Sequence, residues 1–217
     1  MTYKFGDNYK FAYSISPEGG NLVTLGYEQA TPILGSQATF GRAWADWRRY
    51  ISLPWAHHVL AVRATGGANI GEEAGNFYVG GYDSATLLTN VDLRTASSLG
   101  QRQLPMRGYA FGTDTGPMAA ALSAEYRFPL ASVQRGYGIY PVFIRNVHGA
   151  LFAEAGQAWT GPFNWRNNLY SIGAELRAQT HFMQAPSEVR LGIGQGLINP
   201  GRGTQWPQVY ADVGAYF

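Results

Sequence analysis

Four histidines are the residues of this chain best suited to bind a metal ion or to transfer a proton: His57, His58, His148 and His181. His57 and His58 are adjacent, so on a strand they point to opposite faces and cannot chelate one metal ion from the same side. None of the four stands in an H-x-x-x-H or E-x-x-H spacing, the pattern that supports zinc. The sequence therefore predicts no metal site and no cofactor.

A glycine-rich segment, Gly192-Ile193-Gly194-Gln195-Gly196, superficially resembles a dinucleotide-binding fingerprint. It lies inside a predicted strand and no helix follows it, so phosphate binding of that kind is not expected. Glycines on one face of a strand instead allow it to bend and allow a loop to approach closely. A G-x-S-x-G elbow is also missing, and we expect no catalytic residue.

Alternation of apolar and polar residues with a period of two is the main structural signal. It is clearest over residues 170–182, where Ile172 and Leu176 share one face while Glu175 and Arg177 share the other. A helix would mix charge into both faces. The same alternation predicts about nine strands, with boundaries uncertain by about two to four residues. These strands are 8–16, 21–30, 37–50, 57–70, 119–128, 147–159, 170–182, 188–197 and 208–217. Residues 72–116 are predicted to form one long loop.

Composition fits many strands joined by glycine turns. The 217 residues include 14 Tyr, 11 Phe, 6 Trp and 28 Gly, and no run of about 18 apolar residues predicts a transmembrane helix. The absence of cysteine excludes a disulfide scaffold. A net charge of +2 is too small to indicate a nucleic-acid partner.

A membrane barrel turns its apolar face outward to lipid, whereas a soluble protein turns its apolar face inward to a core, so the composition of the two faces distinguishes them. One face carries charges of both signs, which could pair across neighbouring strands. The other is rich in small alanines, which suit lipid chains better than a soluble core. We therefore predict an all-β, antiparallel transmembrane β-barrel domain over residues 1–217, with residues 72–116 extracellular. The alternative is a soluble β-sandwich or lipocalin-like barrel. The charged face comprises Glu28, Arg42, Asp46, Arg48, Arg63, Glu125, Arg127, Glu154, Glu175, Arg177, Glu188, Arg190 and Asp212.

Three motifs carry a family resemblance, mainly over residues 100–217. They are Met106-Arg107-Gly108-Tyr109, then Ser123-Ala124-Glu125-Tyr126-Arg127-Phe128-Pro129-Leu130, then Leu151-Phe152-Ala153-Glu154-Ala155-Gly156. In this order they resemble the bacterial surface antigen barrel shared by BamA and TamA, with Glu154 where the family has Asp. Some relatives carry this barrel behind a TolB-like propeller. The resemblance implies an outer-membrane protein and the C-terminal half of a larger barrel.

The resemblance also implies that the long loop folds into the barrel lumen, where Arg107 pairs with Glu154. A guanidinium meeting a carboxylate there gives a charge-assisted, bidentate hydrogen bond. We name this predicted set the loop lock; it comprises Arg107, Gly108, Tyr109, Phe152, Glu154 and Gly156. The alternative is that Arg107 is an exposed loop residue. A closed barrel of eight or nine strands could not also enclose the loop, so either the loop stays outside or a second copy widens the lumen.

By resemblance, the expected function is protein insertion or translocation at the bacterial outer membrane, without catalysis. Expected partners are the lipid bilayer or detergent, the barrel-assembly machinery, and a second copy joined through strand edges. A C-terminal assembly signal is expected at Tyr210, Gly214 and Phe217. The alternatives are a passive pore or structural barrel, a soluble β-protein, and an outer-membrane phospholipase or protease.

Overall fold

The computed structural model describes residues 1–71, 74–81, 102–136, 138, 140–183, 185–197 and 206–214. Over these ranges the chain consists of strands and two short 3-10 helices, η1 (Pro32–Leu34) and η3 (Trp165–Asn167). No helix in these ranges is long and apolar enough to cross a membrane.

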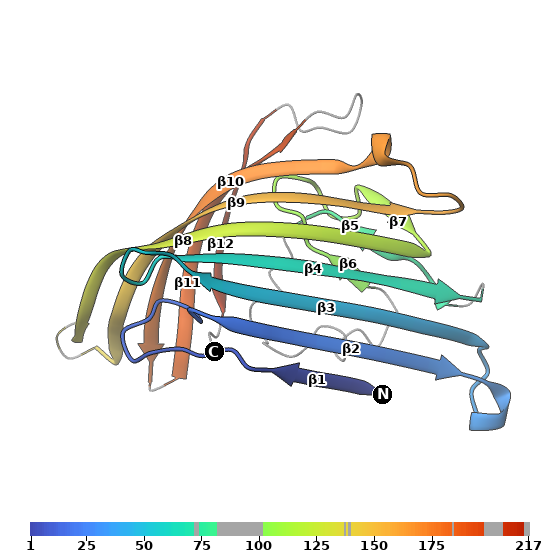
Figure 1. Cartoon of the computed structure of the whole chain (residues 1–217), viewed down its shortest axis with the longest axis horizontal. Helices are drawn as coiled ribbons and strands as arrows, with labels where there is room; N and C mark the ends of the chain where they lie inside the picture. Colours follow the sequence, from blue (N-terminus) through green and yellow to red (C-terminus); the bar gives the residue numbers. More distant parts are fainter. Residues whose placement is uncertain are drawn as a thin grey trace.

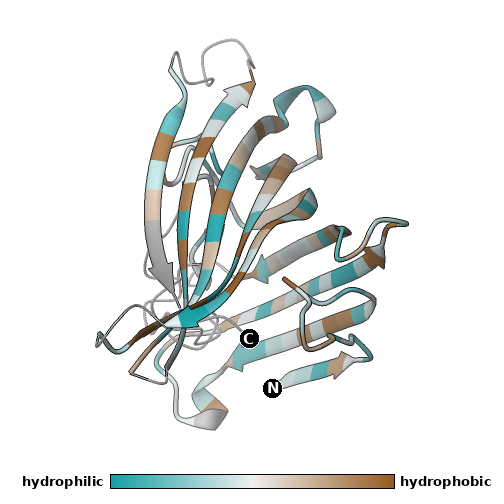
Figure 2. Ribbon diagram, turned by 90° about the vertical axis from the view of Figure 1, so that its left-hand side faces the viewer, coloured by the Kyte–Doolittle hydropathy of each residue, from teal (hydrophilic) through white to brown (hydrophobic). Residues whose placement is uncertain are grey.

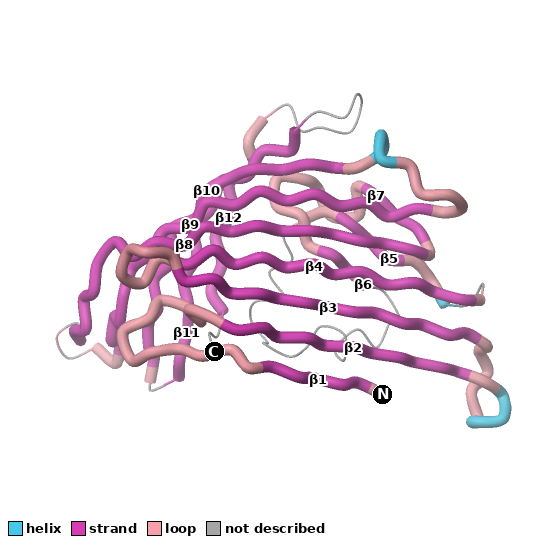
Figure 3. Tube along the Cα trace, viewed as in Figure 1, coloured by secondary structure: helices cyan, strands magenta, loops and turns pink. Residues whose placement is uncertain are grey.

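Nine strands form one continuous, strongly curved antiparallel sheet in the order β1-β2-β3-β4-β8-β9-β10-β11-β12 (Figures 1 and 3). Every neighbouring pair is antiparallel. Over the described residues β1 pairs only with β2, and β12 only with β11, so this part of the sheet is not closed into a barrel. The strands are β1 Thr2–Gly6, β2 Gly20–Ala30, β3 Phe40–Ser52, β4 Val59–Ile70, β8 Met118–Gly136, β9 Val142–Trp159, β10 Leu169–Phe182, β11 Ala185–Leu197 and β12 Gln208–Gly214.

The predicted number of strands in the main sheet is right, but one of them was misplaced. The sequence predicted a strand at 8–16, whereas β1 spans Thr2–Gly6. Residues 8–16 alternate like a strand, yet the Ser14 hydroxyl accepts a hydrogen bond from the Phe11 amide, and such local bonds compete with pairing in a sheet. β8 also extends eight residues beyond the predicted end at 128.

Part of the segment predicted as one loop is ordered into a second, smaller sheet. It contains β5 (Phe77–Val79), β6 (Arg102–Leu104) and β7 (Asp114–Gly116) in the order β6-β5-β7. β5 pairs parallel with β6 and antiparallel with β7. This small sheet lies against the concave side of the main sheet (Figure 1).

Side chains alternate between the two faces of the main sheet, as predicted. On β3, Arg42 and Asp46 are buried on the concave side, whereas Ala43, Ala45 and Trp47 are exposed on the convex side. Bands of apolar and polar residues alternate along the strands in Figure 2. The convex face therefore presents large apolar side chains to its surroundings; among them are Leu25, Trp47, Ile51, Leu151, Ile172, Leu176, Leu191, Ile193 and Val209.

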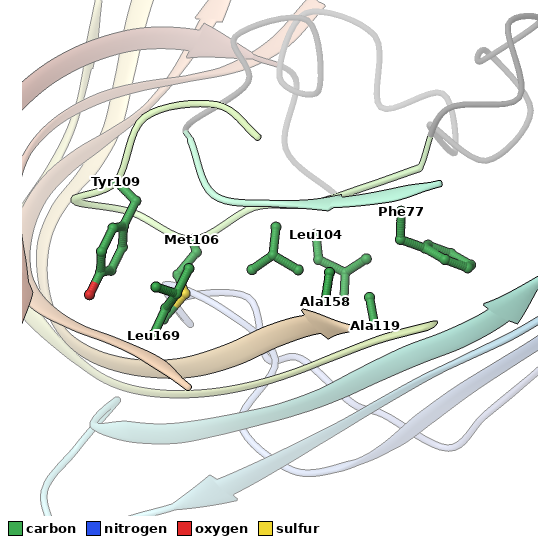
Figure 4. Packing of buried hydrophobic residues seen from close by; sticks show 8 residues of the cluster. Phe77, Leu104, Met106, Tyr109, Ala119, Ala158 and Leu169 are labelled. Carbon is green, nitrogen blue, oxygen red and sulfur yellow. The ribbon is translucent and has the colours of Figure 1, made fainter. Parts of the chain in front are cut away.

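The main apolar cluster lies between the small sheet and the inner wall. Figure 4 shows Phe77, Leu104, Met106 and Tyr109 packed over Ala119, Ala158 and Leu169 of β8, β9 and β10. All of these side chains are at most 6 % exposed. Burial of this surface gives the loop a reason to fold inward, because each fully buried large apolar side chain contributes about 1.5–3 kcal/mol.

Residues 7–19, which connect β1 to β2, cover the other end of the concave side. This end carries the short connections between β3 and β4, β8 and β9, and β10 and β11. The carbonyl oxygens of Ala12 and Ile15 accept hydrogen bonds from Arg145 on β9 and Gln179 on β10. The segment therefore reaches across the sheet from its first strands to its later ones, and we call it the N-terminal strap.

Candidate functional site

Arg107 is held by Glu154 of β9 through both its backbone and its side chain. The backbone amide donates to one carboxylate oxygen at 2.8 Å, while Nε and Nη2 donate to the other at 2.8 and 2.6 Å. Arg107 is 8 % exposed, so the alternative that it is an exposed loop residue is wrong. The described parts of the loop occupy the concave side of the sheet, which is not closed, so the steric conflict expected for a small closed barrel does not arise.

Two further carboxylates converge on the same guanidinium. Nη1 of Arg107 lies 3.0 Å from Glu125 of β8 and 2.7 Å from Glu175 of β10. Arg177, next to Glu175 on the same face of β10, bonds both of these carboxylates, and the Tyr210 hydroxyl of β12 donates to Glu175. One loop side chain thereby joins strands β8, β9 and β10, and Glu175 extends the network to β12.

Arg107 and the carboxylates around it can be buried because their opposite charges compensate each other. A buried ion needs both an opposite charge and hydrogen bonds to compensate for the loss of water. Burial acts to lower the pKa of Arg107, but the carboxylates of Glu154, Glu175 and Glu125 raise this pKa well above its ordinary value. Arg107 therefore remains a cation at any pH at which the protein folds.

Phe152 and Glu154 face the loop together from β9. The guanidinium carbon of Arg107 lies 3.6 Å from the centre of the Phe152 ring, a cation–π contact. The Phe152 ring fills the space beside Gly173 of β10, where a Cβ would come within 2.4 Å of it. Glu154 also accepts hydrogen bonds from Ser123 of β8 and Ser171 of β10, at 3.4 and 3.3 Å.

Gly108 allows the loop to touch the backbone of β11. Its φ is +90°, and a Cβ at this position would lie within 2.9 Å of backbone atoms of Gln195 and Gly196. Gly194 and Gly196 leave the matching space, because a Cβ on either would meet Gly108 or the Tyr109 ring within 2.9 Å. The prediction that the glycine-rich strand admits a close loop is confirmed.

Tyr109, the last residue of the Met106–Tyr109 motif, attaches the loop to β10 and β11. Its hydroxyl lies 2.8 Å from the carbonyl oxygens of both Tyr170 and Leu197, and accepts from the Tyr170 amide at 3.3 Å. Gly156 of β9 leaves room for Val79 of the small sheet, which lies 3.4 Å from where a Cβ would stand. All six residues of the predicted loop lock therefore lie where the loop meets the wall.

Sequence reasoning did not assign Glu125, Glu175, Arg177 or Tyr210 to this cluster. They were expected to form ordinary ion pairs or, for Tyr210, a C-terminal signal. Period-two alternation places each on the concave face, but the spacing along one strand does not show that Glu125 and Glu175 meet Arg107 or that Tyr210 meets Glu175. Gly214 lies at the end of β12, and Phe217 lies outside the described residues.

The histidines do not gather into a site. His57 contacts Glu18 at 2.6 Å, His58 contacts the Tyr126 hydroxyl at 2.7 Å, and His148 contacts Asn146 at 3.3 Å. Among the residues that the structure describes, no group of three or more metal-ligating side chains is placed to hold a metal ion.

An antiparallel sheet with an apolar convex face, a charged concave face and an arginine-tipped loop on that face is consistent with half of a β-barrel that has an inward-folded loop. The family model of the Omp85 superfamily domain matches residues 11–199, and the chain belongs to this superfamily. The resemblance to the BamA and TamA barrel is thereby confirmed. Omp85 proteins are bacterial outer-membrane proteins associated with protein insertion and translocation. No curated protein matches the chain.

Proposed function

We propose that this chain is an integral outer-membrane barrel domain that assists the insertion or translocation of other proteins. The observation that carries the proposal is the combination of an apolar convex face, a sheet whose described edges are unjoined, and a loop tip bonded to four strands through one arginine network. Membership of the Omp85 superfamily supports it.

The faces of the sheet support the orientation in the membrane. Leu151, Ile172 and Leu191 point outward without covering, which suits acyl chains, while the buried Arg–Glu network faces inward. In this arrangement the long-loop end, including residues 72–116, is extracellular, and the N-terminal strap lies at the periplasmic end. The lipid bilayer is the first partner of the domain.

The mechanism rests on the strand edges. An edge strand presents unpaired backbone N–H and C=O groups that another strand can bind by β-augmentation. In hydrocarbon such groups must be satisfied, so an incoming strand at β1 or β12 is stabilised by every hydrogen bond it completes. The loop lock contributes by holding β8, β9 and β10 in a fixed curve while the edges stay available. No bond is made or broken.

The proposed partners of the domain are the barrel-assembly machinery and a second copy of the chain. The barrel-assembly machinery inserts the chain by binding the C-terminal signal at Tyr210, Gly214 and Phe217. In the absence of a client, a second copy pairs with the edges to give one larger barrel. Its mass in detergent would be near twice 23.7 kDa, whereas a stable monomer would contradict it.

A cysteine pair tests the edges directly, because the chain has no native cysteine. Tyr3 of β1 and Val209 of β12 are both exposed, at 69 % and 80 %. In a Tyr3→Cys, Val209→Cys variant, oxidation of a dimer gives a covalent species of twice the mass, whereas self-closure gives a cross-linked monomer.

The functional readout is insertion of an unfolded outer-membrane protein into vesicles that contain the reduced or the oxidised variant. We expect the reduced form to accelerate insertion and the oxidised form to lose this effect; the single-cysteine variants are the controls. Equal insertion with both forms, or none above empty vesicles, contradicts the proposal. Ion conductance without client insertion would instead identify a passive pore.

A further inference from the structure

A cavity of about 280 Å³ lies between the loop tip and the opposite wall of the sheet. On one side it meets the network around Arg107 and Glu154. On the other it is bounded by Arg48 and Tyr50 of β3, Arg63 of β4 and Arg190 of β11. Its size suits a small ligand, since ligand pockets begin at about 300 Å³.

The lining is cationic. Six arginines and three glutamates line the cavity. Two further carboxylates, Asp46 and Glu188, lie behind the arginines, and their side chains are only 2 % and 6 % exposed. The Arg48 and Arg63 side chains in front of Asp46 are 40 % and 37 % exposed. Asp46 and Glu188 are therefore covered, whereas the guanidinium groups of Arg48 and Arg63 are exposed.

Arg48 and Arg63 bring two guanidinium groups together on one wall of the cavity. They are directly opposite each other across β3 and β4, an arrangement of like charges that normally destabilises a sheet. Both bond the single carboxylate of Asp46, which lies 2.9 Å from Nε of each. Arg48 and Arg63 thus meet at Asp46 on a wall of the cavity.

We propose that the wall formed by Arg48, Arg63 and Tyr50 binds a phosphate group. Guanidinium forks match phosphate oxygens bidentately. A tetrahedral dianion directs its oxygens toward several strands at once, as arginines on β3, β4, β8 and β11 require, whereas a planar carboxylate reaches fewer. This site is independent of the proposed role in protein insertion.

Binding is measured by ³¹P NMR line broadening and by calorimetry on the full chain in a phosphate-free detergent. Inorganic phosphate is titrated against sodium chloride at equal ionic strength. A second arm adds phosphatidylglycerol to the micelles, so that a lipid headgroup is distinguished from free phosphate. We expect saturable binding of phosphate that chloride does not reproduce; saturation in the lipid arm alone would assign the phosphate group to a lipid.

The decisive variant is Arg63→Gln, which leaves Asp46 paired with Arg48. We expect it to weaken phosphate binding about tenfold, as the loss of one charge-assisted contact does. Arg49→Gln is the matched control, because Arg49 is the neighbouring residue on the exposed, convex face of β3; it should change affinity less than about twofold.

Folding of each variant is checked by its mobility on an unheated gel, and Arg48→Gln replaces Arg63→Gln if the latter does not fold. The proposal is overturned if neither phosphate nor the lipid binds the wild-type chain. It is also overturned if chloride competes equally, or if the Arg49 control loses as much affinity as the Arg63 variant.

Discussion

Arg107 meets Glu154 twice, through its backbone amide and through its guanidinium, so one carboxylate fixes both the position of the loop and the direction of its side chain. Five protein donors converge on this carboxylate when Ser123 and Ser171 are included. The relationship is local in space but spans 47 residues of sequence.

Glu154→Gln should release the loop without unfolding the sheet. The amide can still accept hydrogen bonds but no longer offsets the buried Arg107 charge, and breaking a buried pair costs about 3–5 kcal/mol. We expect faster hydrogen exchange over residues 102–116 and cleavage there by protease. Glu28→Gln, on a carboxylate that is 45 % exposed, is the control and should leave both measurements unchanged.

Gly108→Ala should displace the motif from β11. Two costs add: the positive φ, worth about 1–3 kcal/mol for a non-glycine residue, and the collision with the backbone of Gln195. Gly161→Ala separates them, because Gly161 also has a positive φ but nothing lies within 4 Å of its added Cβ. If both variants lose equal thermal stability, the close approach to β11 contributes nothing.

Tyr109→Phe should lower the stability of the loop by about 1–2 kcal/mol, because it removes the hydroxyl that bonds Tyr170 and Leu197. Tyr27→Phe, whose hydroxyl bonds Gln29 at an exposed site, should be close to neutral. Thermal melting of both variants in the same detergent gives the comparison.

The Tyr109 hydroxyl also predicts that the stability of the loop falls at alkaline pH. Burial raises the pKa of Tyr109, so the folded chain holds this proton more tightly than the unfolded one. Its contribution is complete below the ordinary tyrosine pKa of about 10 and is lost as the pH rises through the raised value. Protease cleavage of the loop should increase in that range, and less so in Tyr109→Phe. An identical pH profile in the two proteins would contradict the assignment.

The Arg107–Glu154 contact followed from the family resemblance, and the two faces of the sheet followed from period-two alternation. What the sequence did not predict has a physical reason in each case. Glu125 and Glu175 meet Arg107, and Tyr210 meets Glu175, through the arrangement of separate strands, which leaves no mark on the spacing of residues along one strand. The strand predicted at 8–16 is wrong because the backbone of the N-terminal strap bonds within local turns and to side chains of the wall instead of pairing with a neighbouring strand.

Glu18→Ala should loosen the N-terminal strap. Glu18 accepts from the Ser14 hydroxyl at 2.7 Å and contacts His57 at 2.6 Å, and so ties the strap to the turn between β3 and β4. We expect earlier cleavage within residues 7–19 and higher single-channel conductance in planar bilayers. Asp7→Ala, which affects only an exposed contact with the Asn21 amide, is the control. Unchanged conductance would mean that the strap does not obstruct the lumen.

Leu151→Arg tests which face meets lipid. Leu151 is 51 % exposed on the convex side near the middle of β9, where an arginine at the bilayer midplane costs about 2–4 kcal/mol. Thr65→Arg places the same side chain on the concave side, which in a membrane barrel faces the polar interior. Folding into vesicles should fail or slow for the first variant only. The reverse result would exclude a membrane barrel.

Nine strands, an odd number, form the main sheet over the described residues, and this gives its two edges a common direction. Because every pairing is antiparallel, β1 and β12 run the same way. A seam that joined them directly would be parallel, both within one chain and between copies inserted the same way up. A guest strand running the opposite way would pair antiparallel with either edge. On the proposed role in insertion, these edges therefore select one of the two orientations of a guest strand by backbone hydrogen bonds alone.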